Sequence, residues 1–441
     1  MKNTSPHQSV LIVHLGKWVA LVLLLSGLGC KKTTTSPFAA SSDSSLRIFP
    51  GAKGFGIHSP AGRGGKIIKV TNLNADGPGS LRNALAAKGP RIVVFEAGGV
   101  IDLNKVPLVI TEPFLTVAGQ TAPSPGISLI REGMRIETHD VLIQHIRFRM
   151  GDAGMPKKSG FTPECTTSGP QAYNIVVDHC SFSWAVDENM SVSGPRYDGP
   201  AGTSRNVTIS RCIVAEGLYD ASHEKGIHSM GTLVHDNCTN VAVVFNLYAH
   251  NNQRNPYFKA FTTGAIVNNV IYNPGKWGIQ VDFPEDEWIG KGVTPQNCKV
   301  SVVGNWMQHG ANTKPGFGIV GPKGDVYLED NVGLDIGGKA VPQTYGSVRI
   351  LPAKPSWPDG LKALPSEQVV SYVVKHAGAR PQDRDEVDAR IVSEFLARQG
   401  KFINSQEEVG GYPTTRSTVR SLDVPKDNID AWLLSFAKPL E

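Results

Sequence analysis

The sequence predicts an all-β protein, a right-handed parallel β-helix, and a repeated phrase is the main reason. Seven segments carry apolar residues five and three positions before a common anchor. Alternation with a period of two indicates strands with one buried face. Because the segments recur every 23 to 36 residues, they indicate stacked coils rather than a sandwich. The anchors are Ile146, Cys180, Cys212, Asn246, Asn269, Asn305 and Asn331.

Composition and the anchor residues support stacked coils. The 441 residues are 40% hydrophobic, contain 47 glycines and are only 7% aromatic, which suits a turn-rich β protein with a large core. At a strand spacing of ~4.8 Å, each anchor asparagine can hydrogen-bond the coils above and below, and surface turn asparagines are the alternative. The same spacing is slightly long for a disulfide, so we expect Cys180 and Cys212 to be buried free thiols.

The amino end predicts export. Residues 1–29 form a signal peptide in which Lys2 and Lys17 precede an apolar run, 18–29, that is too short to span a bilayer. The sequence Leu28-Gly29-Cys30 resembles a lipoprotein signal, which would make Cys30 a lipidated residue attached to a membrane. Simple secretion is the alternative. Both readings predict a secreted or outer-membrane-anchored protein, with residues 30–47 as a flexible tether.

The charge of the mature chain is mild. Removal of residues 1–30 takes away two lysines and no acid, so the formal net charge falls from +5 to +3. Such an excess does not argue for nucleic acid, and a basic site for an acidic ligand must be local. We expect a monomer.

Within the expected β-helix domain, residues 48–350, a short helix is predicted near the start. Ser80 is an N-cap candidate for a helix that carries Leu81, Ala84 and Leu85. Such a helix would cover the first coil, whose unpaired edge otherwise invites aggregation.

The tail, residues 351–441, is expected to be partly helical. Three prolines after residue 350 interrupt the repeat, and two helical stretches follow, each closed by a glycine, Gly378 and Gly400. Val387, Ile391 and Phe395 give the second stretch one apolar face. We expect the tail to pack along the solenoid or to cap its end.

Acidic residues form the first candidate cluster. Glu164 and the pair Asp187-Glu188 flank the strand NIVVDHCSF on either side, and Asp152 precedes them. Adjacent coils could therefore bring Glu164 and Asp187 together. Clustered carboxylates facing one spot repel each other or hold a hard cation, and Ca²⁺ takes six to eight oxygen ligands. Solvated loop acids are the alternative.

Basic residues form two further clusters. Lys225 lies between two histidines in HEKGIH, and Arg254 and Lys259 lie five apart in QRNPYFK. In an extended segment that spacing could aim both cations toward one groove, and a solvated face is the alternative. Zinc is not predicted, because neither HExxH nor paired CxxC is present.

Five motifs in order are similar to those of the pectate lyases of polysaccharide lyase family 1. They are VVDHCSFSW with DEN, VTIS, HEKG, QRNPYFK and the pair Asn268-Asn269. GSLRNA and DEVDARIV with EEVGGYP resemble the secreted bacterial branch, and the resemblance covers nearly the whole mature chain. It implies calcium-assisted β-elimination of 4-linked polygalacturonate, an acidic polysaccharide, to 4,5-unsaturated oligogalacturonides.

The resemblance also implies roles for single residues. Arg254 matches the family's proton-abstracting base, and Lys225 and Lys259 match substrate-binding positions, although the family has arginine where Lys259 stands. Glu164 and Asp187 match calcium-binding acids, and Glu188 and Asp152 are further candidate ligands. Ser191 stands where the family often has another aspartate, which predicts a weak calcium site. Asp178 and His179 match a structural motif.

Other functions remain as alternatives at this point. A pectin lyase or another uronan lyase is one alternative, and a non-catalytic polysaccharide-binding β-helix at the cell surface is another. A glycoside hydrolase on the same solenoid needs two carboxylic groups flanking the bond. The Asn-Thr-Asp, Asp-Asp and Gly-His-Gly motifs of polygalacturonases are absent from the sequence.

Overall fold

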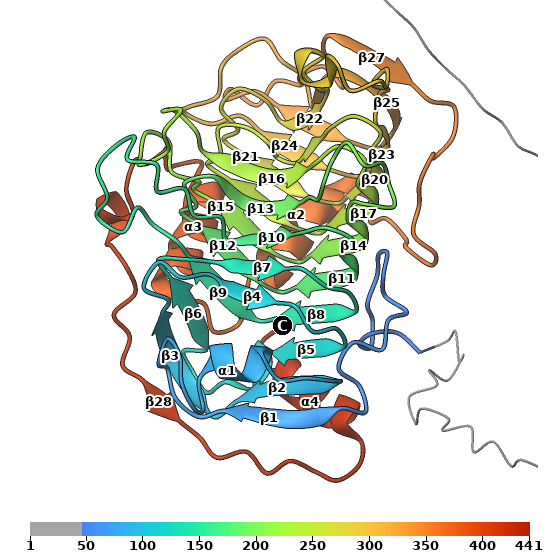
Figure 1. The fold of residues 1–441 in the computed structure, drawn as a ribbon. Coiled ribbons are helices and arrows are strands. Elements are labelled where there is room, and N and C mark those ends of the chain that lie inside the picture. Colours follow the sequence, from blue (N-terminus) through green and yellow to red (C-terminus); the bar gives the residue numbers. More distant parts are fainter. Residues whose placement is uncertain (1–45) are drawn as a thin grey trace, which may run out of the picture. The chain divides into compact units, whose positions relative to one another are not determined.

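The computed structural model describes residues 46–441 and confirms the right-handed parallel β-helix, whose coils stack one upon another (Figure 1). The expected signal peptide, Cys30 and nearly all of the 30–47 tether lie outside the described residues. Each coil contributes strands to as many as three parallel ladders, which we call the first, second and third faces.

The first face contains β1 (Lys66–Val70), β2 (Arg91–Phe95), β5 (Leu115–Ala118), β8 (Val141–Gln144), β11 (Tyr173–Asp178), β14 (Arg205–Ser210), β17 (Thr239–Val244), β20 (Thr263–Val267), β23 (Lys299–Val303), β25 (Val320–Glu329) and β27 (Ser347–Ile350). The second face contains β4 (Leu108–Ile110), β7 (Met134–Ile136), β10 (Thr166–Ser168), β13 (Glu188–Val192), β16 (Met230–Val234), β19 (Tyr257–Phe258), β22 (Ile279–Val281) and the start of β25. The third face contains β3 (Ala97–Asp102), β6 (Ile127–Ile130), β9 (Ile146–Arg149), β12 (Ser181–Ser183), β15 (Ile213–Ala215), β18 (Leu247–Ala249), β21 (Val270–Tyr272), β24 (Trp306–Gln308) and β26 (Val332–Leu334).

The register along the first face agrees with the repeat in the sequence. Ile175 pairs with Val141 on one side and with Val207 on the other, and Val207 pairs with Val241. All four side chains are buried in the main core. The residues expected to point inward are therefore the ones that stack inside the solenoid.

The expected asparagine ladder is confirmed. Asn269 Oδ1 accepts hydrogen bonds from the backbone N–H of Asn246 at 3.0 Å and from its Nδ2 at 2.9 Å. Asn305 Oδ1 accepts the same two hydrogen bonds from Asn269, and Asn331 Oδ1 accepts them from Asn305. Each of these side chains is buried. One coil earlier the backbone N–H of Cys212 donates to Asn246 Oδ1, and the Cys212 thiol is free and buried, like that of Cys180.

The expected first helix is α1 (Leu81–Leu85). The Ser80 hydroxyl accepts from the N–H of Asn83 at 3.2 Å, which caps the helix. Leu81 and Leu85 are buried in the main core, and α1 lies against β1 and β4, so it covers the first coil.

The tail packs along the solenoid. The two expected helices, α2 (Ser366–His376) and α3 (Glu386–Ala397), lie on the third face. β28 (Thr418–Val419) pairs with β3 in the antiparallel sense. Short 3₁₀ turns are η1 (Gly119–Thr121), η2 (Asp286–Trp288) and η3 (Gln406–Val409), and a helix that the sequence analysis did not predict, α4 (Ile429–Ala437), ends the chain.

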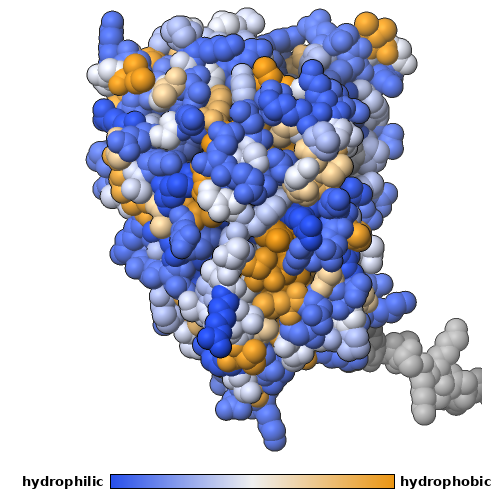
Figure 2. Space-filling model, turned by 90° about the vertical axis from the view of Figure 1, so that its left-hand side faces the viewer, coloured by the Kyte–Doolittle hydropathy of each residue, from blue (hydrophilic) through white to orange (hydrophobic). Residues whose placement is uncertain are grey.

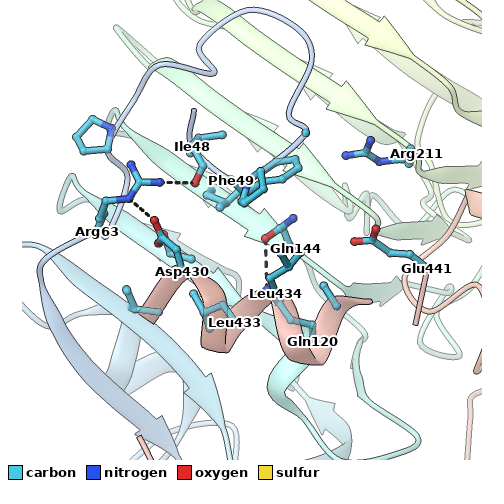
Figure 3. Close-up of a pocket in the computed structure, with 17 residues that line it drawn as sticks. Ile48, Phe49, Arg63, Gln120, Gln144, Arg211, Asp430, Leu433, Leu434 and Glu441 are labelled. Atoms are coloured by element: carbon cyan, nitrogen blue, oxygen red, sulfur yellow. Dashed lines mark hydrogen bonds and ion pairs between the residues drawn. The ribbon is translucent and has the colours of Figure 1, made fainter. Parts of the chain in front are cut away.

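Helix α4 closes a pocket against the first face. Figure 3 shows Leu433 and Leu434 of α4 facing Ile48 and Phe49 of the amino-terminal segment. Arg63 joins the two, because it donates to a backbone carbonyl of that segment and pairs with Asp430 at 2.8 Å. This pocket lies against the first face. The acids of the candidate site, which are described below, lie on the second face.

The face of the molecule shown in Figure 2 is largely hydrophilic. On the side turned to the viewer in Figure 2, polar side chains predominate, and apolar ones gather in one larger patch below the middle and in smaller scattered ones. Among the described residues, we find no helix with the length and apolar character needed to cross a membrane.

Candidate active site

The acids expected to bind calcium meet on adjacent coils of the second face. Glu164 lies just before β10, and Asp187 and Glu188 lie at the start of β13, which pairs with β10. One carboxylate oxygen from each of these three residues lies within 4.8 Å of the other two. The parallel pairing of β10 and β13 therefore brings together residues that are more than twenty positions apart in sequence.

Burial disfavours the charged form of Glu164 in this acidic cluster. Burial, together with the charge of Asp187, raises the pKa of Glu164 to about 6. Ser191 partly offsets this effect, because its hydroxyl donates to Glu164 Oε2. The same Ser191 hydroxyl lies 2.8 Å from the hydroxyl of Thr167, which also hydrogen-bonds Glu164. Ser191 thus lies in the cluster and supports Glu164.

Two histidines hold Asp187 from the other side. His228 Nε2 lies 2.9 Å from Asp187 Oδ1, His223 Nε2 lies 3.8 Å from Asp187 Oδ2, and the two rings stack at 3.6 Å. Burial alone would raise the pKa of Asp187, but the hydrogen bond from His228 and the charges of His228 and Arg254 lower it. The sequence suggests His223 and His228 as zinc ligands, or as candidate bases in place of Arg254, and gives no direct sign that they contact Asp187. Their five-residue spacing on either side of a turn was the available signal for a joint contact.

Arg254 lies beside the same acids. Its guanidinium forms an ion pair with Glu188, and it lies 5.8 Å from the centre of the Tyr257 ring. Burial lowers the pKa of Arg254, which favours its neutral form more than an exposed site would. Its backbone has a φ of 64°. The segment is therefore not extended at this residue, which corrects the expectation from the sequence.

The other predicted site residues lie in different surroundings. Lys225 is exposed on the loop that carries both histidines, where its backbone N–H donates to His223 Nδ1 at 3.1 Å. Lys259 is buried, with its ammonium 2.5 Å from Glu287 and 3.3 Å from Asp236. Arg254 and Lys259 thus pair with separate acids, and the structure does not aim them at one point.

Asp152 is held by the tail. Its carboxylate accepts from the N–H of Gly154 at 2.9 Å and from Gln406 Nε2 at 3.2 Å. Within the described residues it belongs to no candidate metal group, so the structure does not bring it to Glu164, Asp187 and Glu188.

A row of side chains crosses the second face beside the acids. Thr167, Ser191, Leu233, Tyr257 and Gln280 pair from one strand to the next. They alternate with core residues and therefore point away from the core of the solenoid, although all of them except Thr167 are buried. A groove continues toward the earlier coils, and its lining includes Glu132, Arg135, Glu137, Glu164 and Thr167. A groove that crosses successive coils suits an extended polymer.

Comparisons with known proteins agree with this architecture. No protein-family model matches the sequence. A probable pectate lyase C of Aspergillus flavus is 32% identical over 382 residues, which cover 83% of this chain and 82% of that protein. A probable pectate lyase C of Aspergillus fumigatus is 30% identical over 398 residues, which cover 87% of this chain and 86% of that protein.

Two solved structures share the fold. The major cedar-pollen allergen jun a 1 aligns with a TM-score of 0.54 at 16% identity and covers 74% of this chain and 92% of its own. A pectate lyase bound to a hexasaccharide aligns with a TM-score of 0.50 at 14% identity and covers 77% of this chain and 99% of its own.

The parallel β-helix and these relatives define a polysaccharide lyase. The chain belongs to the pectate lyase family. The curated relatives named above are fungal, and membership of a bacterial branch stays a prediction.

Proposed function

We propose that this protein is a calcium-dependent pectate lyase that cleaves 4-linked polygalacturonate by β-elimination and releases 4,5-unsaturated oligogalacturonides. The observation that carries the proposal is the cluster of Glu164, Asp187 and Glu188 beside Arg254. Carboxylates for a hard cation and a partly desolvated base then lie on one face of the solenoid.

The donor set fits Ca²⁺. Three carboxylates within 4.8 Å supply the hard oxygen ligands that this ion prefers. The raised pKa of Glu164 indicates that this carboxylate gains from a neighbouring positive charge. Glu164, Asp187 and Glu188 would hold the ion, and Ser191, in place of a further carboxylate, makes the expected affinity modest. When bound, Ca²⁺ would neutralise the substrate carboxylate and so acidify the C5 proton.

Arg254 is the proposed base. In the structure its guanidinium forms an ion pair with Glu188, so it can accept a proton only after this ion pair has opened and the guanidinium has lost a proton. Burial favours the neutral form that a base requires. Lys225, exposed on its loop, is free to meet a substrate carboxylate. The C5 proton would pass to neutral Arg254, the C4–C5 double bond would form as the bond from C4 to the leaving oxygen breaks, and the leaving oxygen would take a proton from water.

The proposed setting is outside the cytoplasm. A monomer that is secreted, or anchored through lipidated Cys30, would meet its acidic polysaccharide directly. Residues 1–30 carry the features of such a leader.

The test is the ultraviolet absorbance of the unsaturated product on polygalacturonate, with and without chelator. Only a lyase gives this product, so its absence rejects the proposal in favour of a binding protein. A parallel assay on methylated pectin distinguishes a pectin lyase from a pectate lyase. Excess EDTA should abolish turnover, and full activity in EDTA would exclude calcium dependence.

Asp187→Ala gives a matched test of the metal site. It removes one of three carboxylates and should raise the calcium concentration needed for half activity, or abolish turnover, without changing the β-rich circular dichroism. Asp152→Ala is the control, because Asp152 contacts the tail instead. An equal loss in both variants would contradict the assigned ligands.

A further inference from the structure

Lys259 shares its acidic partner with a second cation, Arg196. Lys259 follows β19 and Arg196 follows β13, both on the second face. Glu287 Oε2 lies 2.5 Å from Lys259 Nζ and 2.7 Å from an Arg196 guanidinium nitrogen. Asp236 lies behind them, 3.3 Å from Lys259 and 3.6 Å from Arg196. One oxygen of Glu287 thus bridges two cations.

Asp236 and Glu287 differ in how readily their side chains can move away from the two cations. The Asp236 side chain is fully buried, and its Oδ1 accepts from the backbone N–H of Ala260 at 3.0 Å. The Glu287 side chain is 33% exposed and extends from η2, in the loop between β22 and β23. Rotation of its side chain would be enough to withdraw Glu287, whereas Asp236 is fixed as a permanent counter-ion. Without Glu287, the two cations and Asp236 carry a net positive charge.

Neighbouring aromatic residues hold the loop that carries Glu287 in place. Tyr197 donates its hydroxyl to the backbone carbonyl of Glu287 at 2.8 Å, and Trp288 is buried against Tyr197 and Phe261. The loop backbone is therefore anchored while the Glu287 side chain is half-buried. His235 Nε2 lies 3.2 Å from Arg196, and burial, with the charge of Lys259, lowers its pKa to about 3. Neutral His235 can accept a hydrogen bond from Arg196 without adding charge.

We propose that Arg196 and Lys259 form a carboxylate-binding subsite for the uronate polymer, which Glu287 fills until substrate displaces it. The inference rests on the proposed function. Lys259 is two residues beyond Tyr257 in the outward row, so the subsite lies on the same face as the acids. The Arg196 fork and the Lys259 ammonium both suit a carboxylate. Glu287 presents the same chemical group as a galacturonate residue.

Glu287→Gln tests the subsite, because it keeps the side-chain size and removes the competing charge. An internal occupant lowers apparent affinity in proportion to the time that the subsite is free. If Glu287 fills it about 70–90% of the time, the variant should bind trigalacturonate about 3–10-fold more tightly. The measurements are calorimetric binding of trigalacturonate in EDTA and KM on polygalacturonate with Ca²⁺, where the same fall is expected. Glu287→Asp, with a shorter arm, should shift both values in the same direction.

Three controls separate the explanations. Glu285→Gln removes an exposed acid of the same loop that pairs with Lys323, and it should change neither value. Arg196→Ala should weaken binding and raise KM. The fully methyl-esterified trisaccharide, which has no charge, should gain nothing from Glu287→Gln. Unchanged affinity and KM in Glu287→Gln, or an equal gain for the ester, would overturn the subsite. A wild type without unsaturated product rejects the proposed function instead, whatever Glu287→Gln does to binding.

Discussion

At Arg254, the ion pair with Glu188 favours the charged guanidinium, whereas burial lowers its pKa and favours the neutral form. If Arg254 takes the C5 proton, Arg254→Lys should lower kcat about 10²–10⁴-fold, because a shorter arm of different shape places no base at the same point. Lys225→Ala should instead raise KM at least as much as it lowers kcat. Both constants are measured on polygalacturonate at alkaline pH with saturating Ca²⁺. Near-normal kcat with a changed KM would make Arg254 a substrate clamp.

Glu164 gives a residue-scale prediction on pH. Its pKa is about 6 in the folded protein, above the ordinary carboxyl value of about 4.3, so the folded state binds this proton more tightly than the unfolded chain. The metal-free protein should therefore lose stability as the pH rises from about 4 to 6, by roughly 2 kcal/mol from this group. In EDTA, Glu164→Gln should raise the Tm at pH 8 and leave it nearly unchanged at pH 4. Equal melting at pH 8 would show that ionised Glu164 carries no penalty.

At the scale of elements, local patterns predicted the strands, and long-range contacts decided much of the site. The inward residues were predictable because strand alternation and the repeated anchor are properties of neighbouring positions. Asp152 was grouped with the other acids from its place in the chain, but Gln406 of the tail holds it elsewhere. Lys259 matched a motif, whereas its partner Glu287 comes from a different coil. Helix α4 was missed although Trp432, Leu433 and Phe436 follow a helical spacing, and no side chain caps its start.

The asparagine ladder gives an element-scale prediction. Asn269 accepts two hydrogen bonds from Asn246 and donates to Asn305 Oδ1 and to the carbonyl of Val243. Asn269→Leu leaves these buried partners unpaired, which should cost about 1–3 kcal/mol of unfolding free energy. Thermal or urea unfolding measures the change. Asn83→Leu, at an exposed position in α1, is the comparison, and an equally small loss in both variants would mean that the buried ladder adds no stability.

At the scale of the whole molecule, charged pairs attach the tail to the third face. Arg149 in β9 has a fully buried side chain and lies 2.7 Å from Asp388 and 3.1 Å from Asp385, at the start of α3. The other carboxylate oxygen of Asp388 accepts from Ser181 of β12 at 2.6 Å. Apolar contacts surround these pairs, since Val387 and Ile391 of α3 pack with Ile213 and Leu247 of the solenoid. The tail therefore adds a second layer that the β-helix repeat does not provide.

Asp388→Ala tests how far this layer depends on its buried charges. Removing one partner leaves Arg149 buried and incompletely paired, so we expect a loss of about 3–5 kcal/mol and earlier proteolysis of the tail. Adding Arg149→Met should restore part of the loss, because the uncompensated charge is then gone. Glu386→Ala, at an exposed position in the first turn of α3, is the control. Because the acids and Arg254 lie on the second face, kcat well below the Tm should stay close to wild type. Unchanged melting and protease resistance in Asp388→Ala would show that the apolar contacts alone attach the tail.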